Sequence, residues 1–294
     1  MVKQDKDKYG SPKYRFVVRV TNRQCIVQVM AAKIQGDVCL TRASSLELSR
    51  YGIPEVETGK HGPKKAVLGA TNYAACYATG LLAARRLLQS LKLDGVYGGV
   101  TEADGEFFEI EPADEGAGPF KCILDVGLKR TTTGAKVFAA MKGGADGGLL
   151  IPHEEKRFPG FDEGALETEV LKDHIFANHV GEYMDYLEEE DEERHAKQFA
   201  HYIKAGISGE GFEEMWKGCH AAIRADPKAG AKNSKDYAAW GRKSARENGA
   251  YLARQNYQQR KASVLQRIQT AQKNAREEAE NASSEEEGSG SGSD

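Results

Sequence analysis

The sequence predicts an α+β fold: an antiparallel or mixed sheet covered by helices, followed by a helical extension and a basic C-terminal helix. Apolar and polar residues alternate over residues 14–43, as they do in strands with one buried face. Apolar residues recur at helical spacing over 71–92, after 134 and again over 166–225. Because the strands gather ahead of most of the helices, the order favours α+β over a repeating βα pattern.

The first segment, residues 14–43, is a predicted antiparallel meander. Turns at Asn22-Arg23 and at 35–37 separate strands at about 14–21, 25–32 and 38–43. In the first strand, Tyr14, Phe16, Val18 and Val20 share one face, and Arg15, Val17, Arg19 and Thr21 share the other. Two arginines on one face, with Lys13, Asn22 and Arg23 at the strand ends, favour a surface that follows phosphates. The alternative is a row of solvated charges.

The next segment is predicted to be a loop over 52–70 and then a helix from about Thr71 to Lys92. Thr71 or Asn72 can cap the start of this helix, and Gly95 can end it. Arg85 and Arg86 fall near its far side, where we expect solvent. Beyond it, 96–100 and 107–110 are predicted strands around an acidic loop.

The corner at residues 122–136 is the strongest candidate for a binding site. A short apolar run, predicted to be a buried strand, ends at Gly127 and is followed by Lys129 and Arg130. Thr131, Thr132 and Thr133 can cap a helix starting near Gly134, with Lys136 in its first turn. Cations, hydroxyls and a helix N-terminus together suit an anionic oxygen such as phosphate. The alternative is that the threonines are only a redundant cap. The glycines at 143–148 follow the helix, so we interpret them as a C-cap and turn.

Beyond residue 160 the chain becomes acidic and helical. Residues 161–196 carry 13 acidic and 2 basic side chains, and the run 188–193 is entirely acidic. Residues 228–276 reverse this balance with 12 basic and 2 acidic side chains, and aromatic residues lie among them. Such a stretch suits RNA, through stacking and phosphate contacts. We place boundaries at 160, 227 and 276, and expect 277–294 to be a disordered acidic tail.

Composition narrows the class of protein. The chain has 294 residues, a net charge of −3 and 40% hydrophobic residues. No apolar run is long enough for a membrane span, and the start lacks the apolar core of a signal peptide. The five cysteines are scattered without a Cys-x-x-Cys pair, so we expect buried thiols in a reducing compartment. We therefore expect neither metal nor cofactor.

A series of motifs, taken together, resembles one family. The motifs are Lys13-Tyr14-Arg15, Arg19-Val20-Thr21-Asn22-Arg23, Thr71-Asn72-Tyr73, Arg130-Thr131-Thr132-Thr133-Gly134, Ile151-Pro152-His153 and Lys156-Arg157-Phe158-Pro159-Gly160. In this order they are similar to the large-subunit ribosomal proteins that bind 5S ribosomal RNA, the universal L-eighteen family, called L-five in eukaryotes. The similarity covers roughly residues 3–227 well and the remainder loosely.

The resemblance implies a non-enzymatic structural protein that binds 5S rRNA in the central protuberance. It implies large-subunit rRNA and the neighbouring ribosomal protein of the 5S ribonucleoprotein (eukaryotic L-eleven) as partners, and a cytoplasmic ribosomal location reached through nucleus and nucleolus. The RNA-binding residues it implies, together with the basic positions above, are Lys13, Tyr14, Arg15, Arg19, Asn22, Arg23, Asn72, Tyr73, Lys129, Arg130, Thr131, Thr132, Thr133, Lys136, Lys156, Arg157, Arg242, Lys243, Arg246, Arg254, Arg260 and Lys261.

Two departures from the family accompany this resemblance. Family members usually begin with a longer arginine-rich arm, and their C-termini are usually lysine-rich, whereas this chain ends in acidic residues. Three other functions compete: a related 5S-binding protein acting off the ribosome, an acidic interaction scaffold built on 161–196, and a phosphate-handling enzyme. An enzyme would need a general base near the 129–136 corner. His153 is better explained as a packed or RNA-facing residue, and Asp125 as a local ion-pair partner of Lys129.

Overall fold

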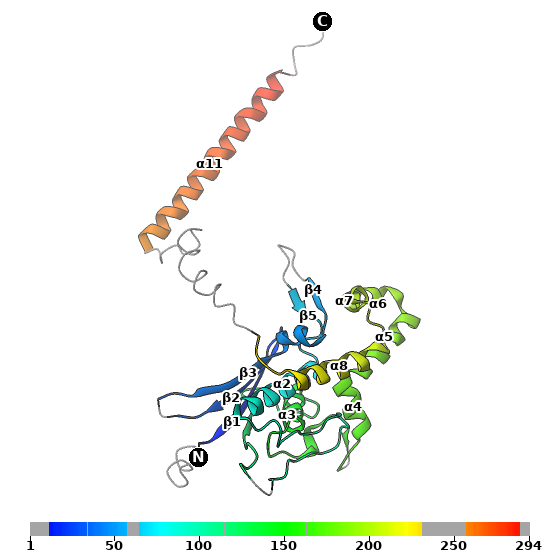
Figure 1. Ribbon diagram of the computed structural model, residues 1–294. Coiled ribbons are helices and arrows are strands. Elements are labelled where there is room, and N and C mark those ends of the chain that lie inside the picture. The colour runs from blue at the N-terminus through cyan, green and yellow to red at the C-terminus, as the bar shows by residue number, and fades with distance from the viewer. Residues whose placement is uncertain are drawn as a thin grey trace. The chain divides into compact units, whose positions relative to one another are not determined.

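The computed structural model describes residues 12–33, 35–57, 65–113, 116–162, 164–230 and 257–288, with side chains to residue 276 in the last range. The chain divides into two units, residues 1–229 and 230–294, which are considered separately. The predicted α+β class is confirmed: a mixed four-stranded sheet is accompanied by several helices (Figure 1).

The main sheet has the strand order β3-β2-β1-β6. The predicted meander is confirmed, with β1 at Tyr14–Val20, β2 at Cys25–Ala31 and β3 at Val38–Ser44, paired antiparallel. The fourth strand, β6 at Ile123–Asp125, runs parallel to β1. It was predicted to be buried, and this is wrong: β6 is an edge strand, and Ile123 is 44% exposed.

Two helices, α2 (Tyr73–Leu91) and α3 (Lys136–Asp146), pack against each other beside the sheet (Figure 1). A methyl group on Gly80 would overlap the carbonyl oxygen of Ala140, and one on Gly143 would overlap that of Tyr77. Gly143 therefore allows close contact with α2. Gly143 and Gly144 both lie within α3, contrary to the prediction that they form a C-cap and turn. Only Gly147 and Gly148 serve as the C-cap and the turn.

The structure corrects the predictions for the C-terminal end of α2 and for its two arginines. Asn72 caps the helix, its side chain accepting a hydrogen bond from the Ala75 backbone N–H at 2.6 Å. The helix ends at Leu91, with Lys92 rather than Gly95 in the left-handed conformation. Arg86 is only 9% exposed and donates to the carbonyls of Arg42 and Pro227 and to Glu47. Arg85 likewise donates to the carbonyls of Asp94, Tyr97, Gly98 and Gly147, so the prediction that both arginines are solvated is wrong.

The segments around α2 also differ from the predictions. A 3-10 helix, η1 at Ser45–Tyr51, begins with a Ser44–Glu47 capping box that was visible in the sequence. The predicted loop contains a small hairpin of β4 (Glu55–Glu57) and β5 (Lys65–Val67). Residues 96–100 and 107–110, predicted as strands, are irregular. The backbone of 96–100 is held in part by the side chains of Arg85 and Arg224 rather than by a sheet.

The acidic extension is helical, as predicted. Its elements are η2 (Glu155–Arg157), β7 (Phe161–Asp162), β8 (Ala165–Leu166), α4 (Thr168–Phe176), α5 (Asn178–Glu190), α6 (Glu192–Gln198), α7 (Ala200–Ala205) and α8 (Gly211–Ala225). It does not separate at residue 160, however. Trp216 and Ile223 of α8 and Leu171 of α4 belong to the same buried core as Phe16 and Leu82, so residues 1–229 form one unit.

A buried ion pair inside this core was not predicted. The side chains of Lys142 and Asp146, one turn apart on α3, are both 0% exposed, and their Nζ and Oδ1 atoms lie 2.6 Å apart. The Tyr77 hydroxyl donates to Asp146 at 2.7 Å, and Lys142 also donates to the Glu106 carbonyl. Burial raises the pKa of Asp146, and its contacts with Lys142 and Tyr77 offset part of that rise.

The second unit contains α11 (Tyr257–Gly288). Its helical backbone extends past the boundary predicted at residue 276, and glutamate and alanine in this stretch are strong helix formers. Residues 289–294 lie outside the described ranges. In the described parts of both units, no helix is long and apolar enough to cross a membrane. Four cysteines are buried as predicted, whereas Cys39 is exposed.

Candidate nucleic-acid interface

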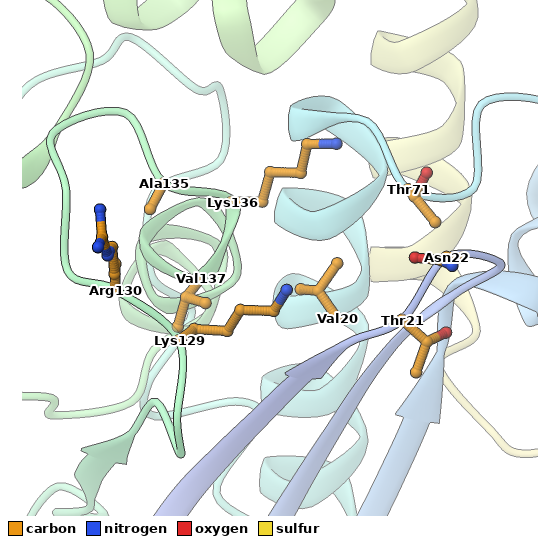
Figure 2. A pocket seen from close by; sticks show the side chains of 9 residues that line it. All are labelled: Val20, Thr21, Asn22, Thr71, Lys129, Arg130, Ala135, Lys136 and Val137. Atoms are coloured by element: carbon orange, nitrogen blue, oxygen red, sulfur yellow. The ribbon is translucent and has the colours of Figure 1, made fainter.

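A pocket of about 510 Å³ opens where the end of β1, the start of α2 and the loop before α3 meet (Figure 2). We call it the cationic pocket, because Lys129, Arg130 and Lys136 line it. Its other lining residues are Val20, Thr21, Asn22, Thr71, Ala135 and Val137. Figure 2 shows Lys129 and Lys136 extending toward the β1–β2 turn and the start of α2, with Arg130 at the far edge.

The turn between β1 and β2 is shaped by Thr21. Its hydroxyl donates to the Gln24 carbonyl at 3.0 Å and accepts from the backbone N–H groups of Arg23 and Gln24. This local bonding leaves the side chains of Asn22 and Arg23 exposed. The sequence therefore placed these two candidates correctly at a solvent-facing turn, but it did not single out Thr21 or Thr71 as pocket residues.

The cations of the pocket are exposed. Among the residues described, no carboxylate forms an ion pair with Lys129, Arg130 or Lys136. Gly127, with φ +64°, follows β6 and directs the chain into this loop. Unpaired exposed ammonium and guanidinium groups are the side chains that neutralise phosphate. The loop thus presents three positive charges over one hollow.

The three threonines do not cap α3, contrary to one prediction. The helix begins at Lys136 after Gly134, which has φ +76°, and its N-cap residue Ala135 makes no side-chain hydrogen bond. Thr131, Thr132 and Thr133 are exposed, and only a long contact of 3.4 Å joins the Thr133 hydroxyl to the Lys156 carbonyl. Their hydroxyls therefore remain available to a ligand.

The segment 154–160 lies against this loop. The Gly134 backbone N–H donates to the Arg157 carbonyl at 3.0 Å, which brings Lys156 and Arg157 beside the threonines. Both side chains are exposed, and Lys156 pairs with Glu154 at 2.7 Å. His153 is packed between Phe107 and Phe158, and burial lowers its pKa. It is a structural histidine rather than a base at the corner.

Arg15 and Arg19, which were predicted to follow phosphates, are both held by carboxylates. Both pair with Asp125, at 2.9 Å and 2.8 Å, and Arg15 also pairs with Asp37. Asp125 therefore pairs across strands rather than with Lys129. Burial alone would raise the pKa of Asp125, but the hydrogen bond and charge of Arg19, the Gly127 N–H and the charge of Arg15 lower it.

The remaining candidates divide between structural and exposed positions. Tyr14 packs against Phe120 with tilted rings whose centroids lie 4.5 Å apart, Tyr73 is buried edge-on to His174, and Asn72 is the α2 cap. Lys13 is half-buried. On α11, Arg260 and Lys261 are exposed. The other four predicted basic contacts lie outside the described residues: Arg242, Lys243, Arg246 and Arg254.

In chemical terms, the cationic pocket can bind but is not equipped to catalyse. None of its nine lining residues is a histidine, a cysteine or a carboxylate, so it holds no general base of the usual kind. No group of three or more potential metal ligands occurs in the described parts of the chain. An α+β unit with an exposed cationic hollow favours the nucleic-acid-binding class of protein.

Comparison with known proteins narrows this class to a family. Residues 1–154 match the family described as ribosomal large subunit proteins 60S L5 and 50S L18, and residues 212–273 match a ribosomal L18 C-terminal region. The protein from Oikopleura dioica named large ribosomal subunit protein uL18 is 50% identical over 266 residues, covering 90% of this chain and 80% of its own. Proteins of that name from Drosophila melanogaster and Helianthus annuus are 51% and 50% identical, covering 79% and 77% of this chain and 74% and 73% of their own.

The chain belongs to this family of large-subunit ribosomal proteins, as the motifs indicated. Members are structural, non-enzymatic components of the ribosome that associate with rRNA.

Proposed function

We propose that this protein binds 5S rRNA and anchors the 5S ribonucleoprotein in the central protuberance of the large ribosomal subunit. The observation that carries the proposal is the set of unpaired cations around the cationic pocket. Lys129 and Lys136 approach it from one side, and the polar turn at Thr21 and Asn22 closes the other. This arrangement suits a phosphate backbone with neighbouring hydroxyl groups.

The exposed threonines extend the proposed contact. Because Thr131 and Thr132 make no helix cap, their hydroxyls can donate to phosphate oxygens or accept from ribose 2′-hydroxyls. Arg157 and Asn22 continue the polar surface on either side. By contrast, Arg15 and Arg19 serve mainly to hold Asp125, and their contribution to RNA affinity is expected to be secondary.

The proposal extends to partners and location. We expect assembly with the neighbouring ribosomal protein of the 5S ribonucleoprotein (eukaryotic L-eleven) and with large-subunit rRNA, after passage through the nucleus and nucleolus. A band-shift assay with 5S rRNA and that protein, added singly and together, tests the assembly. Absence of a ternary band at concentrations that give both binary complexes would contradict it.

The RNA contact is tested by filter binding of the full chain to 5S rRNA and to a scrambled RNA of equal length. The variant Lys129→Ala/Lys136→Ala should bind 5S rRNA more weakly, and its log–log salt slope should be less steep by about 1.4–1.8, at about 0.7–0.9 for each phosphate that is no longer neutralised. The control Lys197→Ala/Lys204→Ala removes the same charge from exposed positions on α6 and α7. Equal slopes for the two variants, or equal affinity for both RNAs, would contradict the proposal.

A second variant tests the hydroxyls. Replacing Thr131, Thr132 and Thr133 with valine keeps their shape but removes the donors. Because none caps a helix, the free energy of unfolding should change by less than about 0.5 kcal/mol, while 5S rRNA affinity falls. Unchanged affinity with intact stability would remove the threonines from the interface.

A further inference from the structure

A second pocket, of about 440 Å³, lies between α8, α4 and the loop at 101–104. We call it the α8 pocket, and it shares no lining residue with the cationic pocket. Its interior is formed in part by His220 and Arg224, one turn apart on α8. Lys172, Lys217, Glu102 and Asp104 also line it, and all four are exposed. The pocket therefore combines buried nitrogen atoms with exposed charges of both signs.

Two buried nitrogen atoms of this pocket have no hydrogen-bond partner among the described residues: Nε2 of His220 and Nε of Arg224. His220 is only 7% exposed. The terminal nitrogens of Arg224 already donate to the carbonyls of Gly98 at 2.9 Å, Asp146 at 3.2 Å and Val100. These bonds fix the guanidinium and leave its Nε–H for a ligand. A buried polar group without a partner is costly, so these two nitrogen atoms indicate a missing hydrogen-bond partner.

The ligand group that meets these nitrogens is an anionic oxygen. Arg224 supplies a positive charge and an N–H donor. Burial, followed by the charge of Arg224, lowers the pKa of His220 to about 3, so the ring is neutral at physiological pH and can donate from one nitrogen. Lys172 adds positive charge. The Lys217 ammonium pairs with Glu213 at 2.7 Å and lies 5.6 Å from the centroid of the Phe176 ring. A carboxylate fits these donors.

The acidic residues around the α8 pocket argue against a long polyanion such as RNA as its ligand. Residues 101–113 carry five carboxylates and no lysine or arginine. An RNA strand would be repelled by them, whereas Glu102 and Asp104 would attract a cationic group that lies a few atoms from the bound carboxylate. A carboxylate and a cation joined by a short chain occur together in a C-terminal lysine or arginine.

We propose that the α8 pocket binds the C-terminal residue of a polypeptide partner that ends in arginine or lysine. The terminal carboxylate lies against Arg224 Nε and His220 Nε2, and the basic side chain reaches Glu102 and Asp104. The proposal is independent of 5S rRNA binding, because the two pockets have no residue in common. It adds a protein-binding site on a surface of mixed charge.

The test is isothermal titration of the full chain with acetyl-Gly-Gly-Arg bearing a free carboxylate. The C-terminally amidated peptide should bind at least about tenfold more weakly, as expected for loss of a charge-assisted hydrogen bond. Acetyl-Gly-Gly-Gly should also bind more weakly, and Glu102→Gln/Asp104→Asn should reduce the difference between the Arg and Gly peptides. Free arginine, run in parallel, distinguishes a peptide site from an amino-acid site. Equal binding of acid and amide, or tighter binding of free arginine or of inorganic phosphate, would overturn the proposal.

A pocket-filling variant locates the binding. Ala221 lines the α8 pocket and is exposed, so Ala221→Phe fills it without removing a buried group. It should lower peptide affinity by at least about tenfold. Ala205→Phe adds the same ring at an exposed position of α7 and should leave affinity unchanged. Because neither position is buried, both variants should fold. Unchanged affinity in Ala221→Phe would show that the peptide binds elsewhere and would overturn the assignment.

Discussion

Asp125 links β1 to β6, and its removal gives a quantitative prediction. Its Oδ2 accepts from Arg15 at 2.9 Å, and its Oδ1 accepts from Arg19 at 2.8 Å and from the Gly127 N–H at 3.0 Å. Asp125→Asn removes the charge and leaves one oxygen for three donors. The arginine side chains are 36% and 44% exposed, so each ion pair is screened and contributes roughly 0.2–1 kcal/mol.

We therefore expect Asp125→Asn to lower the free energy of unfolding by about 1–2 kcal/mol at pH 7, or to lower Tm by roughly 2–8 °C. The contacts lower the pKa of Asp125 in the folded protein, and the unfolded carboxyl titrates near pH 4. The stabilisation is therefore present above about pH 4 and is lost as pH falls through the folded pKa. Parent and variant should consequently converge in stability at acid pH.

The variant should also change RNA binding, because it removes the negative charge beside two guanidinium groups. Scrambled RNA should bind more tightly at low salt, with a slope steeper by about 0.7–0.9 for each additional phosphate neutralised. Urea denaturation at several pH values and filter binding measure the two effects. Glu188→Gln, which removes one exposed charge from α5, is the control. If both variants have the stability and salt slope of the parent protein, the Asp125 contacts neither stabilise the sheet nor restrain the arginines.

Three other perturbations test the core. Gly80→Ala should lower the free energy of unfolding, measured by urea denaturation, by about 1–3 kcal/mol, because the added methyl group meets the Ala140 carbonyl. Gly98→Ala, where the methyl group enters open space, should lower it much less. Similar losses in the two variants would refute the close packing. Lys142→Met should lower the free energy of unfolding by about 3–5 kcal/mol, because it leaves the buried Asp146 charge without a partner. Adding Asp146→Leu should restore part of the lost stability. No recovery in the double variant would contradict the pairing. Burial lowers the pKa of His220 to about 3, so only the unfolded ring gains a proton as pH falls from about 6.5 to 3. The free energy of unfolding should therefore fall across that pH window, and His220→Gln should make its dependence on pH less steep. An unchanged pH dependence in the variant would contradict burial of the ring.

The features that depend on local pattern were readable from the sequence. Alternation located the strands of the meander, because each side chain of a strand points to the face opposite its neighbour's. Helical spacing located α2 and the acidic helices for the equivalent reason. Lys129, Arg130 and Lys136 were identified as a group because they are close together in the chain. The linked motifs were sufficient to identify the family.

The tertiary structure decided which distant groups meet. Periodicity specifies a buried face but not its partner, so the sequence did not reveal that Asp125 binds arginines 106 and 110 residues away. For the same reason it misplaced Arg86, whose partners lie at residues 42 and 47 and at residue 227. The threonines were misassigned as a cap because Gly134, with its positive φ, delays the helix to Lys136. Burial of Lys142 required the whole core, since only surrounding contacts can stabilise a charge removed from water.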